Sequence, residues 1–172
     1  MENETAAIAL DALRVRITEV FPEQIRTCLD QLTDDEIWSR PNDSTNSIGN
    51  IALHLAGSLD HYLNRNLGGM EFKRDRDAEF AERRHIPRDE LRARFDAMVS
   101  QAEKTFASLT PQRLGDPSPE PKMHSLVIED LINIAVHLAN HTGQIVWITK
   151  MLRSAVVNDV WINAHKKAAW RR

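Results

Sequence analysis

The 172-residue sequence is poor in several features, and each shortage excludes a class of structure or partner. Cys28 is the only cysteine, so the chain can form neither an intramolecular disulfide nor a cluster of thiolate metal ligands. No apolar run approaches the ~20 residues that a membrane-spanning helix requires. A net charge of -3 gives no electrostatic reason to expect nucleic acid as a partner. The sequence therefore predicts no membrane span and no nucleic-acid complex.

The motifs of several enzyme classes are also missing. The sequence has no glycine-rich phosphate-binding loop and no G-x-S-x-G motif, and nothing around Cys28 marks it as a nucleophile. The first residues are acidic at Glu2 and Glu4 and lack the basic start of a secretory signal peptide, so we expect a cytoplasmic protein. No alternating pattern typical of a strand occurs before Leu152, which favours a helical fold.

Four segments with apolar residues at helical spacing cover most of the chain. We expect these helices at about 5–32, 47–67, 87–109 and 125–152. Pro22 should kink or divide the first, Asn46 or Ser47 should cap the second, and Ser125 should cap the fourth. The sequence thus predicts an all-α, up-and-down four-helix bundle over residues 1–152, with long connections. Residues 153–172 should form an irregular C-terminal tail that packs on the bundle or extends from it.

Two segments outside these helices are harder to interpret. The connection 71–85 is highly charged and has few apolar residues, so we expect a solvated loop or surface turn. Residues 156–162 are ambiguous between a short strand-like arm and a helical turn.

Two histidines four residues apart, His137 and His141, lie within the longest apolar helical pattern of the chain. Residues i and i+4 of an α-helix share one face, so both imidazoles can point at the same place. The stripe of this segment consists of Val127, Leu131, Ile134, Leu138, His141, Ile145, Ile148 and Leu152. His141 is therefore expected in a core position, with His137 beside it.

A third histidine, His54, has a similar apolar setting in the second predicted helix. Burying three imidazoles is costly unless each finds a partner, and one divalent metal would satisfy all three. The alternative for each ring is a core position with an ordinary hydrogen bond. Three protein nitrogens with an open fourth position are typical of a reactive zinc site, whereas structural zinc is usually closed by four ligands. We predict a metal site formed by His54, His137 and His141 between the second and fourth helices.

Other metal chemistries do not fit the residues around this pair. A zinc metalloprotease of the H-E-x-x-H type needs a glutamate directly after the first histidine, where this chain has Leu138. A di-iron carboxylate bundle needs a glutamate three residues before each histidine, where this chain has Ile134 and Leu138. An all-histidine site remains.

The segments 46–57 (NSIGNIALHLAG) and 137–145 (HLANHTGQI) together resemble the DinB-like superfamily. The resemblance covers the chain from the first helix to Leu152, and the His-x-x-x-His-x-x-Gln-Ile run is its most specific part. It implies a four-helix bundle with one metal-ligating histidine on the second helix and a pair on the last. For this chain, it implies a divalent metal, zinc or nickel, bound by His54, His137 and His141.

Characterised members of that superfamily include thiol-dependent S-transferases, a mycothiol-dependent isomerase and metal-dependent hydrolases. The resemblance therefore favours an enzyme that activates a low-molecular-weight thiol for transfer to an electrophilic small molecule. A hydrolase that activates water at the same site is an alternative, as is a non-enzymatic dimer with a structural metal. The resemblance also implies a homodimer. In the non-enzymatic alternative, the interface could include Trp38, Trp147, Trp161 and Trp170, although burial in a core is more common for a residue such as Trp147.

Several other polar residues lie within reach of the predicted site. Asn50, His61 and Gln144 can share a face with a ligand histidine, and helix packing is the competing interpretation for each. Asp60 and Asn140 are candidates to orient a metal-bound imidazole through its other nitrogen. We assign no catalytic role to these five residues.

Overall fold

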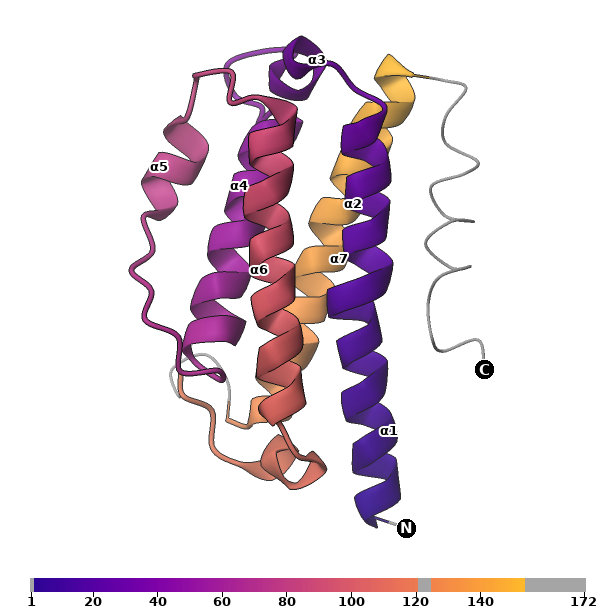
Figure 1. Cartoon of the computed structure of the whole chain (residues 1–172), viewed down its shortest axis with the longest axis vertical. Coiled ribbons are helices and arrows are strands. Elements are labelled where there is room, and N and C mark those ends of the chain that lie inside the picture. The colour runs from indigo at the N-terminus through magenta and orange to yellow at the C-terminus, as the bar shows by residue number, and fades with distance from the viewer. Residues whose placement is uncertain (1, 121–124, 154–172) are drawn as a thin grey trace.

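The computed structural model describes residues 2–120 and 125–153, which form helices joined by loops (Figure 1). The all-α fold class is confirmed for these residues. The expected C-terminal tail, with the ambiguous segment 156–162, lies outside them, apart from its first residue.

The first long helix is divided where the sequence predicts a disturbance near Pro22. It consists of α1 (Glu2–Val15), a π-helical segment η1 (Arg16–Val20) and α2 (Phe21–Asp30). Proline has no N–H to donate, and its ring collides with the carbonyl four residues earlier. A wider π turn just ahead of Pro22 accommodates both effects, and the amide of Phe21 donates to the carbonyl of Arg16.

The next segment contains the short helix α3 (Asp34–Trp38), α4 (Ile48–Leu59) and a second π-helical segment η2 (Asp60–Arg65). Of the two predicted caps for α4, Ser47 is the one used. Its hydroxyl accepts from the amide of Asn50, and the Asn50 side chain accepts in return from the amide of Ser47. This reciprocal pair satisfies amides that would otherwise lack partners at the helix start.

The second half of the chain contains α5 (Arg76–Ala81), α6 (Arg88–Ser108), the 3-10 turn η3 (Pro111–Gly115) and α7 (Val127–Leu152). The predicted Ser125 cap of α7 is wrong. The helix begins two residues later, and the carboxylate of Glu129 accepts from the amides of Ser125 and Leu126.

Four long helical units run along the bundle: α1 with α2, α4 with η2, α6, and α7 (Figure 1). Strict alternation of direction is broken once, because α4 and α6 run the same way. Trp38, next to the start of α4, donates to the carbonyl of Ile86 just before α6, and Thr105 near the end of α6 donates to Asn64 near the end of η2. The connection between them therefore returns along the bundle, and α5 lies within it.

The core follows the predicted apolar stripes of all four units. Its buried members include Ile17, Ile25, Leu29, Leu55, Leu59, Leu63, Leu91, Phe95, Leu131 and Leu138. Full burial of such side chains contributes about 1.5–3 kcal/mol each, which makes this core the main source of stability. Trp147 is an exception to the expectation of a buried tryptophan, since 62% of its surface is exposed.

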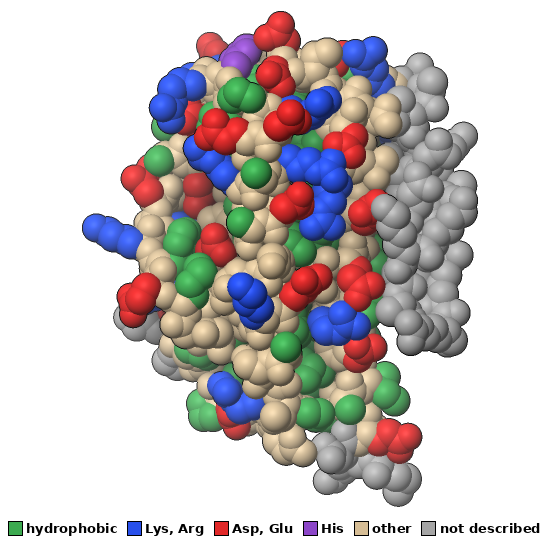
Figure 2. All heavy atoms as spheres, in the orientation of Figure 1, with side chains coloured by type: hydrophobic (Ala, Val, Ile, Leu, Met, Phe, Trp, Pro, Cys, Tyr) green, Lys and Arg blue, Asp and Glu red, His purple; other side chains and the backbone are tan. Residues whose placement is uncertain are grey.

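The face formed by α2 and α6 is covered by intermixed positive and negative side chains (Figure 2). Arg26 on α2 pairs with Asp96 on α6 at 2.6 Å. In a second pair, the arginine is Arg92 on α6 and the carboxylate is Asp30 on α2. These pairs connect two helices whose apolar sides already pack in the core.

Among the residues described, none of the helices is both long and apolar enough to cross a membrane.

Candidate metal centre

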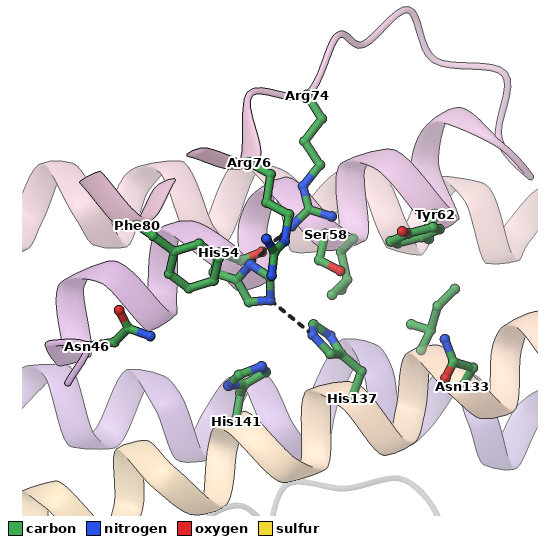
Figure 3. A pocket seen from close by; sticks show the side chains of 12 residues that line it. Asn46, His54, Ser58, Tyr62, Arg74, Arg76, Phe80, Asn133, His137 and His141 are labelled. Carbon is green, nitrogen blue, oxygen red and sulfur yellow. Dashed lines mark hydrogen bonds between the residues drawn. The ribbon is translucent and has the colours of Figure 1, made fainter. Parts of the chain in front are cut away.

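The structure brings His54, His137 and His141 together on facing sides of α4 and α7 (Figure 3). Nε2 of His54 lies 3.1 Å from Nε2 of His137. One ring nitrogen of each histidine lies within 4.8 Å of the others, and the ring centres are 4.7–5.0 Å apart. Residues 83 positions apart in the sequence therefore meet at one point.

The spacing suits a metal ion. Two nitrogens bound to one zinc ion at about 2.0–2.1 Å in tetrahedral geometry lie about 3.3 Å apart. The separation of the His54 and His137 nitrogens is close to this distance, and the ligand nitrogen of the half-buried His141 lies within 4.8 Å of both. The cluster thus fits a three-histidine metal site.

A buried glutamate orients His54. Oε2 of Glu79 lies 3.0 Å from Nδ1 of His54, and the Glu79 side chain is 10% exposed. Nη2 of Arg74 also lies 3.1 Å from this Nδ1, but it donates to Glu79. Because a carboxylate only accepts, we assign the hydrogen of His54 to Nδ1, and the lone pair of Nε2 then faces the other histidines. Carboxylate–histidine pairs of this kind hold the metal-binding imidazole in its tautomer and orientation.

An arginine completes this arrangement. Arg74 donates to both oxygens of Glu79, through Nε at 2.7 Å and Nη2 at 2.8 Å. Burial alone would raise the pKa of Glu79, but the hydrogen bonds from Arg74 and His54 outweigh it and lower that pKa. Glu79 is therefore ionised and remains a hydrogen-bond acceptor for His54.

The connection 71–85, expected as a solvated loop or surface turn, is mostly exposed, but it also contains α5 and delivers the buried Glu79 to the site. Asp75 caps α5 by accepting from the amide of Ala78. Asn50 on α4 donates to the carbonyls of Glu79 at 3.0 Å and Glu82 at 3.1 Å, which fastens α5 against α4. The groups buried here are an ion pair and backbone carbonyls rather than apolar side chains. The hydropathy of the sequence therefore did not predict that this connection packs on α4.

A glycine permits the close approach of α5. Gly57 lies on α4, and a Cβ at this position would collide with the carboxylate of Glu79. A glycine inside a helical pattern is a signal for such an approach. Gly57 is therefore a sequence signal that some segment packs closely on α4 at this position, but it does not identify that segment. Arg74 and Glu79 stand among similar charged residues and were missed.

His141 has its own orienting partner. Oε1 of Gln144, one turn later on α7, lies 3.0 Å from Nδ1 of His141. The amide oxygen only accepts, so Nδ1 carries the hydrogen and Nε2 is free to bind a metal. His141 itself is half-buried at the cavity wall, whereas Leu138 and Ile145 of the same stripe are fully buried.

The electrostatics of the site keep His137 and His141 neutral. Burial lowers the pKa of His137 to about 4, with further contributions from His141, His54 and two arginines. Burial also lowers the pKa of His141, although the bond to Gln144 opposes that shift. Neutral imidazoles are the form that binds metal, so His137 and His141 are in the form that binds an ion at neutral pH.

A cavity of about 340 Å³ opens beside the three rings. It is lined by Asn46, His54, Ser58, Leu59, Tyr62, Arg74, Arg76, Phe80, Asn133, Ile134, His137 and His141. Figure 3 shows the histidines between α4 and α7, with Ser58, Tyr62 and Asn133 further along the same helices. A ligand of small-molecule size can therefore reach the nitrogens.

Five further polar residues were considered near the site from the sequence, and four of them make no contact with the three histidines. His61 lies 3.6 Å from Glu120, Asp60 accepts from Asn64, and Asn140 is exposed. Asn50 is engaged by the helix cap and α5. Of the five, Gln144 alone contacts a site histidine.

A second, apolar groove of about 650 Å³ adjoins the site. Asn46 lines both, and Gln144 forms part of the groove wall while it holds His141. Trp147 and Met151, which are exposed on α7, also line the groove.

Residues 5–165 match a family model described as "Protein of unknown function (DUF1572)". No curated protein matches the chain.

Proposed function

Because the chain belongs to the DUF1572 family, whose description assigns no function, we propose an activity from the site itself. We propose a metal-dependent enzyme that activates a low-molecular-weight thiol for transfer to an electrophilic small molecule. His54, His137 and His141 would hold the divalent ion, zinc or nickel. The convergence of their nitrogens at the wall of an open cavity carries the proposal.

The orientation of the rings favours metal ligation over ordinary core packing. His54 and His141 each donate through Nδ1, to Glu79 and Gln144 respectively. Both hydrogen bonds leave a lone pair on Nε2, and for His54 this nitrogen lies 3.1 Å from Nε2 of His137. Core histidines need no such common direction.

The cavity favours a reactive site over a structural one. Three protein ligands leave a coordination position open, and the space beside them admits a small molecule. The order of the histidines and the His-x-x-x-His-x-x-Gln-Ile run also support membership of the DinB-like superfamily, which we propose as the wider relationship of this family.

A divalent ion bound here would lower the pKa of a coordinated thiol and so supply a thiolate at neutral pH. In the overall transfer, a sulfur–carbon bond forms, the bond to the leaving group breaks with its electron pair, and the thiol proton passes to water. The residues of the chain prepare this reaction: Glu79 and Gln144 hold two imidazoles, and Arg74 keeps Glu79 ionised.

We also propose that the protein is a cytoplasmic homodimer. The exposed apolar side chains of Trp147 and Met151 on α7 support a contact between copies. Sedimentation that shows only the 19.6 kDa monomer at high concentration would overturn the dimer.

The activity is tested by metal analysis of the purified protein, followed by a screen of thiols against a model electrophile. We expect about one zinc or nickel per chain, and turnover that requires both metal and thiol. His85→Ala is a matched control, because this exposed histidine pairs with Asp35 away from the site. Hydrolysis of an ester or amide without any thiol would favour the hydrolase instead, and no turnover with bound metal would favour a structural role.

A further inference from the structure

The cavity extends from the histidines along two helical faces that carry polar groups. Ser58 and Tyr62 lie four and eight residues after His54, and Asn133 lies four residues before His137. These spacings keep them on the faces that bear the histidines, and Figure 3 shows them on one side of His137. A ligand held at the histidines can therefore extend toward this end of the cavity.

These groups are not used by the protein itself. Within residues 2–120 and 125–153, the side chains of Ser58, Tyr62 and Asn133 form no hydrogen bond with another described residue. Ser58 is only 5% exposed. Tyr62 is partly buried and Asn133 is exposed, so the three side chains offer unpaired polar groups at the cavity wall to the polar groups of a ligand.

The charge of the cavity points to an anion. Two arginines and no carboxylate residue line it. Arg74 is bound to Glu79 through two hydrogen bonds, whereas Arg76 makes no ion pair with any described residue. The guanidinium of Arg76 lies 5.0 Å from the ring centre of Phe80, which holds it at the cavity wall. Arg76 is thus an available cation beside the histidines.

The adjoining groove differs from this cavity. Its wall is mostly apolar, with Ile51, Trp147, Ile148 and Met151 among its residues. A hydrophilic molecule gains few hydrogen bonds there. At about 340 Å³, the histidine cavity lies at the lower end of the volumes of ligand pockets, about 300–1,000 Å³, which suits a small polar molecule.

We propose that the histidine cavity binds a hydrophilic thiol that carries a carboxylate, with Arg76 as the residue that recognises the carboxylate. This inference rests on the proposed function, because the sulfur occupies the open metal position. The hydroxyls of Ser58 and Tyr62 and the amide of Asn133 bind the polar body of the thiol.

The experiment uses the full-length protein loaded with cobalt(II), whose visible spectrum reports thiolate binding directly. The probes are 3-mercaptopropionate, 2-mercaptoethanol and cysteamine, which carry a negative, a neutral and a positive group. We expect the wild type to bind the carboxylate thiol most tightly. Arg76→Ala should weaken this binding about tenfold and leave the affinity for 2-mercaptoethanol within about twofold.

Lys73→Ala is the matched control for loss of positive charge, because Lys73 is exposed on the same connection and does not line the cavity. It should bind all three thiols like the wild type. Arg76→Lys should recover part of the preference, since it restores the charge without the planar geometry. Folding of each variant is checked by circular dichroism and by the cobalt spectrum before thiol is added.

The outcomes separate the two proposals. An equal preference for the carboxylate thiol in Arg76→Ala and the wild type would overturn the role of Arg76 and leave thiol activation intact. A cobalt spectrum that no thiol changes would overturn the proposed function, and this inference with it.

Discussion

Two ion pairs between an arginine and a carboxylate serve different purposes in this molecule. The pair between Arg74 and Glu79 lies beside the histidines, with side chains 9% and 10% exposed. The pair between Arg26 and Asp96 lies on the α2–α6 face, with side chains 22% and 39% exposed. Water competes for the second pair but hardly for the first, so the energetic consequences of breaking them should differ.

The two pairs differ in what happens when one charge is removed. On the α2–α6 face, removing a charge leaves its partner accessible to water. At the site, Glu79 also accepts from His54, so removing it leaves both a buried guanidinium and an unoriented imidazole. The surface pair is an addition to a core already packed, whereas the buried pair determines the geometry of the predicted metal ligands.

The largest effect should come from the ligands themselves. His141→Ala should reduce zinc affinity more than about a hundredfold, since losing a ligand costs more than losing a group that orients one. Activity should be lost, and the helical circular dichroism spectrum should remain, because the aliphatic stripes still define the core. Competition with a chromophoric chelator measures the affinity. Full metal affinity in His141→Ala would refute the three-histidine site.

Glu79→Gln breaks the buried pair while it keeps the size of the side chain. Zinc affinity should fall about 10–100-fold, and the free energy of unfolding should fall by about 2–4 kcal/mol because Arg74 loses its buried countercharge. Denaturant titration of the metal-free protein isolates the second effect. An unchanged zinc affinity would show that Glu79 does not orient His54.

Acidification should affect the site before it affects the α2–α6 pairs, which contain no histidine. The folded-state pKa of His137 is about 4, below the ordinary value of 6.5, and that of His141 is also lowered. The unfolded chain therefore binds more protons between these values, so stability is complete above about pH 6.5 and declines as pH falls to about 4. After allowance for solvent screening, the loss is about 1–2 kcal/mol.

This pH dependence is measured as the melting temperature of the metal-free protein between pH 7 and pH 4. Bound metal should be released over the same range, because protons compete for the imidazole nitrogens. His137→Gln should flatten the profile in this window. A wild-type profile that is already flat would contradict the burial of neutral histidines.

The smallest effect should come from Asp96→Asn on the α2–α6 face. The free energy of unfolding should change by less than about 1 kcal/mol, and zinc affinity should not change. The same denaturant and chelator measurements apply, with Glu79→Gln as the comparison. If Asp96→Asn lowers the free energy of unfolding as much as Glu79→Gln does, the two ion pairs do not differ in the way proposed here.

The sequence predicted the bundle and the meeting of the three histidines because both depend on periodicity. Spacings of three and four residues determine which faces of the helices are apolar, and the same spacings place His137 and His141 on one face. The ligand role of the three histidines remains a prediction. The C-terminal tail also remains untested.

The residues around the histidines were harder to predict. Glu79 reaches His54 from a connection whose composition is that of a solvated segment, and only the three-dimensional path of that connection distinguishes it from neighbouring acids. The sequence also did not predict that Trp147 is exposed. This residue lies beside the apolar stripe of α7 and lines a groove. Periodicity reports which face of a helix is apolar, and it does not report where a connection crosses that helix.

The returning connection between α4 and α6 also bears on the order in which the site forms during folding. The contact between His54 and Glu79 spans 25 positions of the chain, and that between His54 and His137 spans 83. Closing the longer loop costs about 1 kcal/mol more in chain entropy. Contacts that close short loops form earlier on average. His54 should therefore acquire its orienting carboxylate while α7 is still undocked, and metal capture should be the last event, with a rate set by the docking of α7.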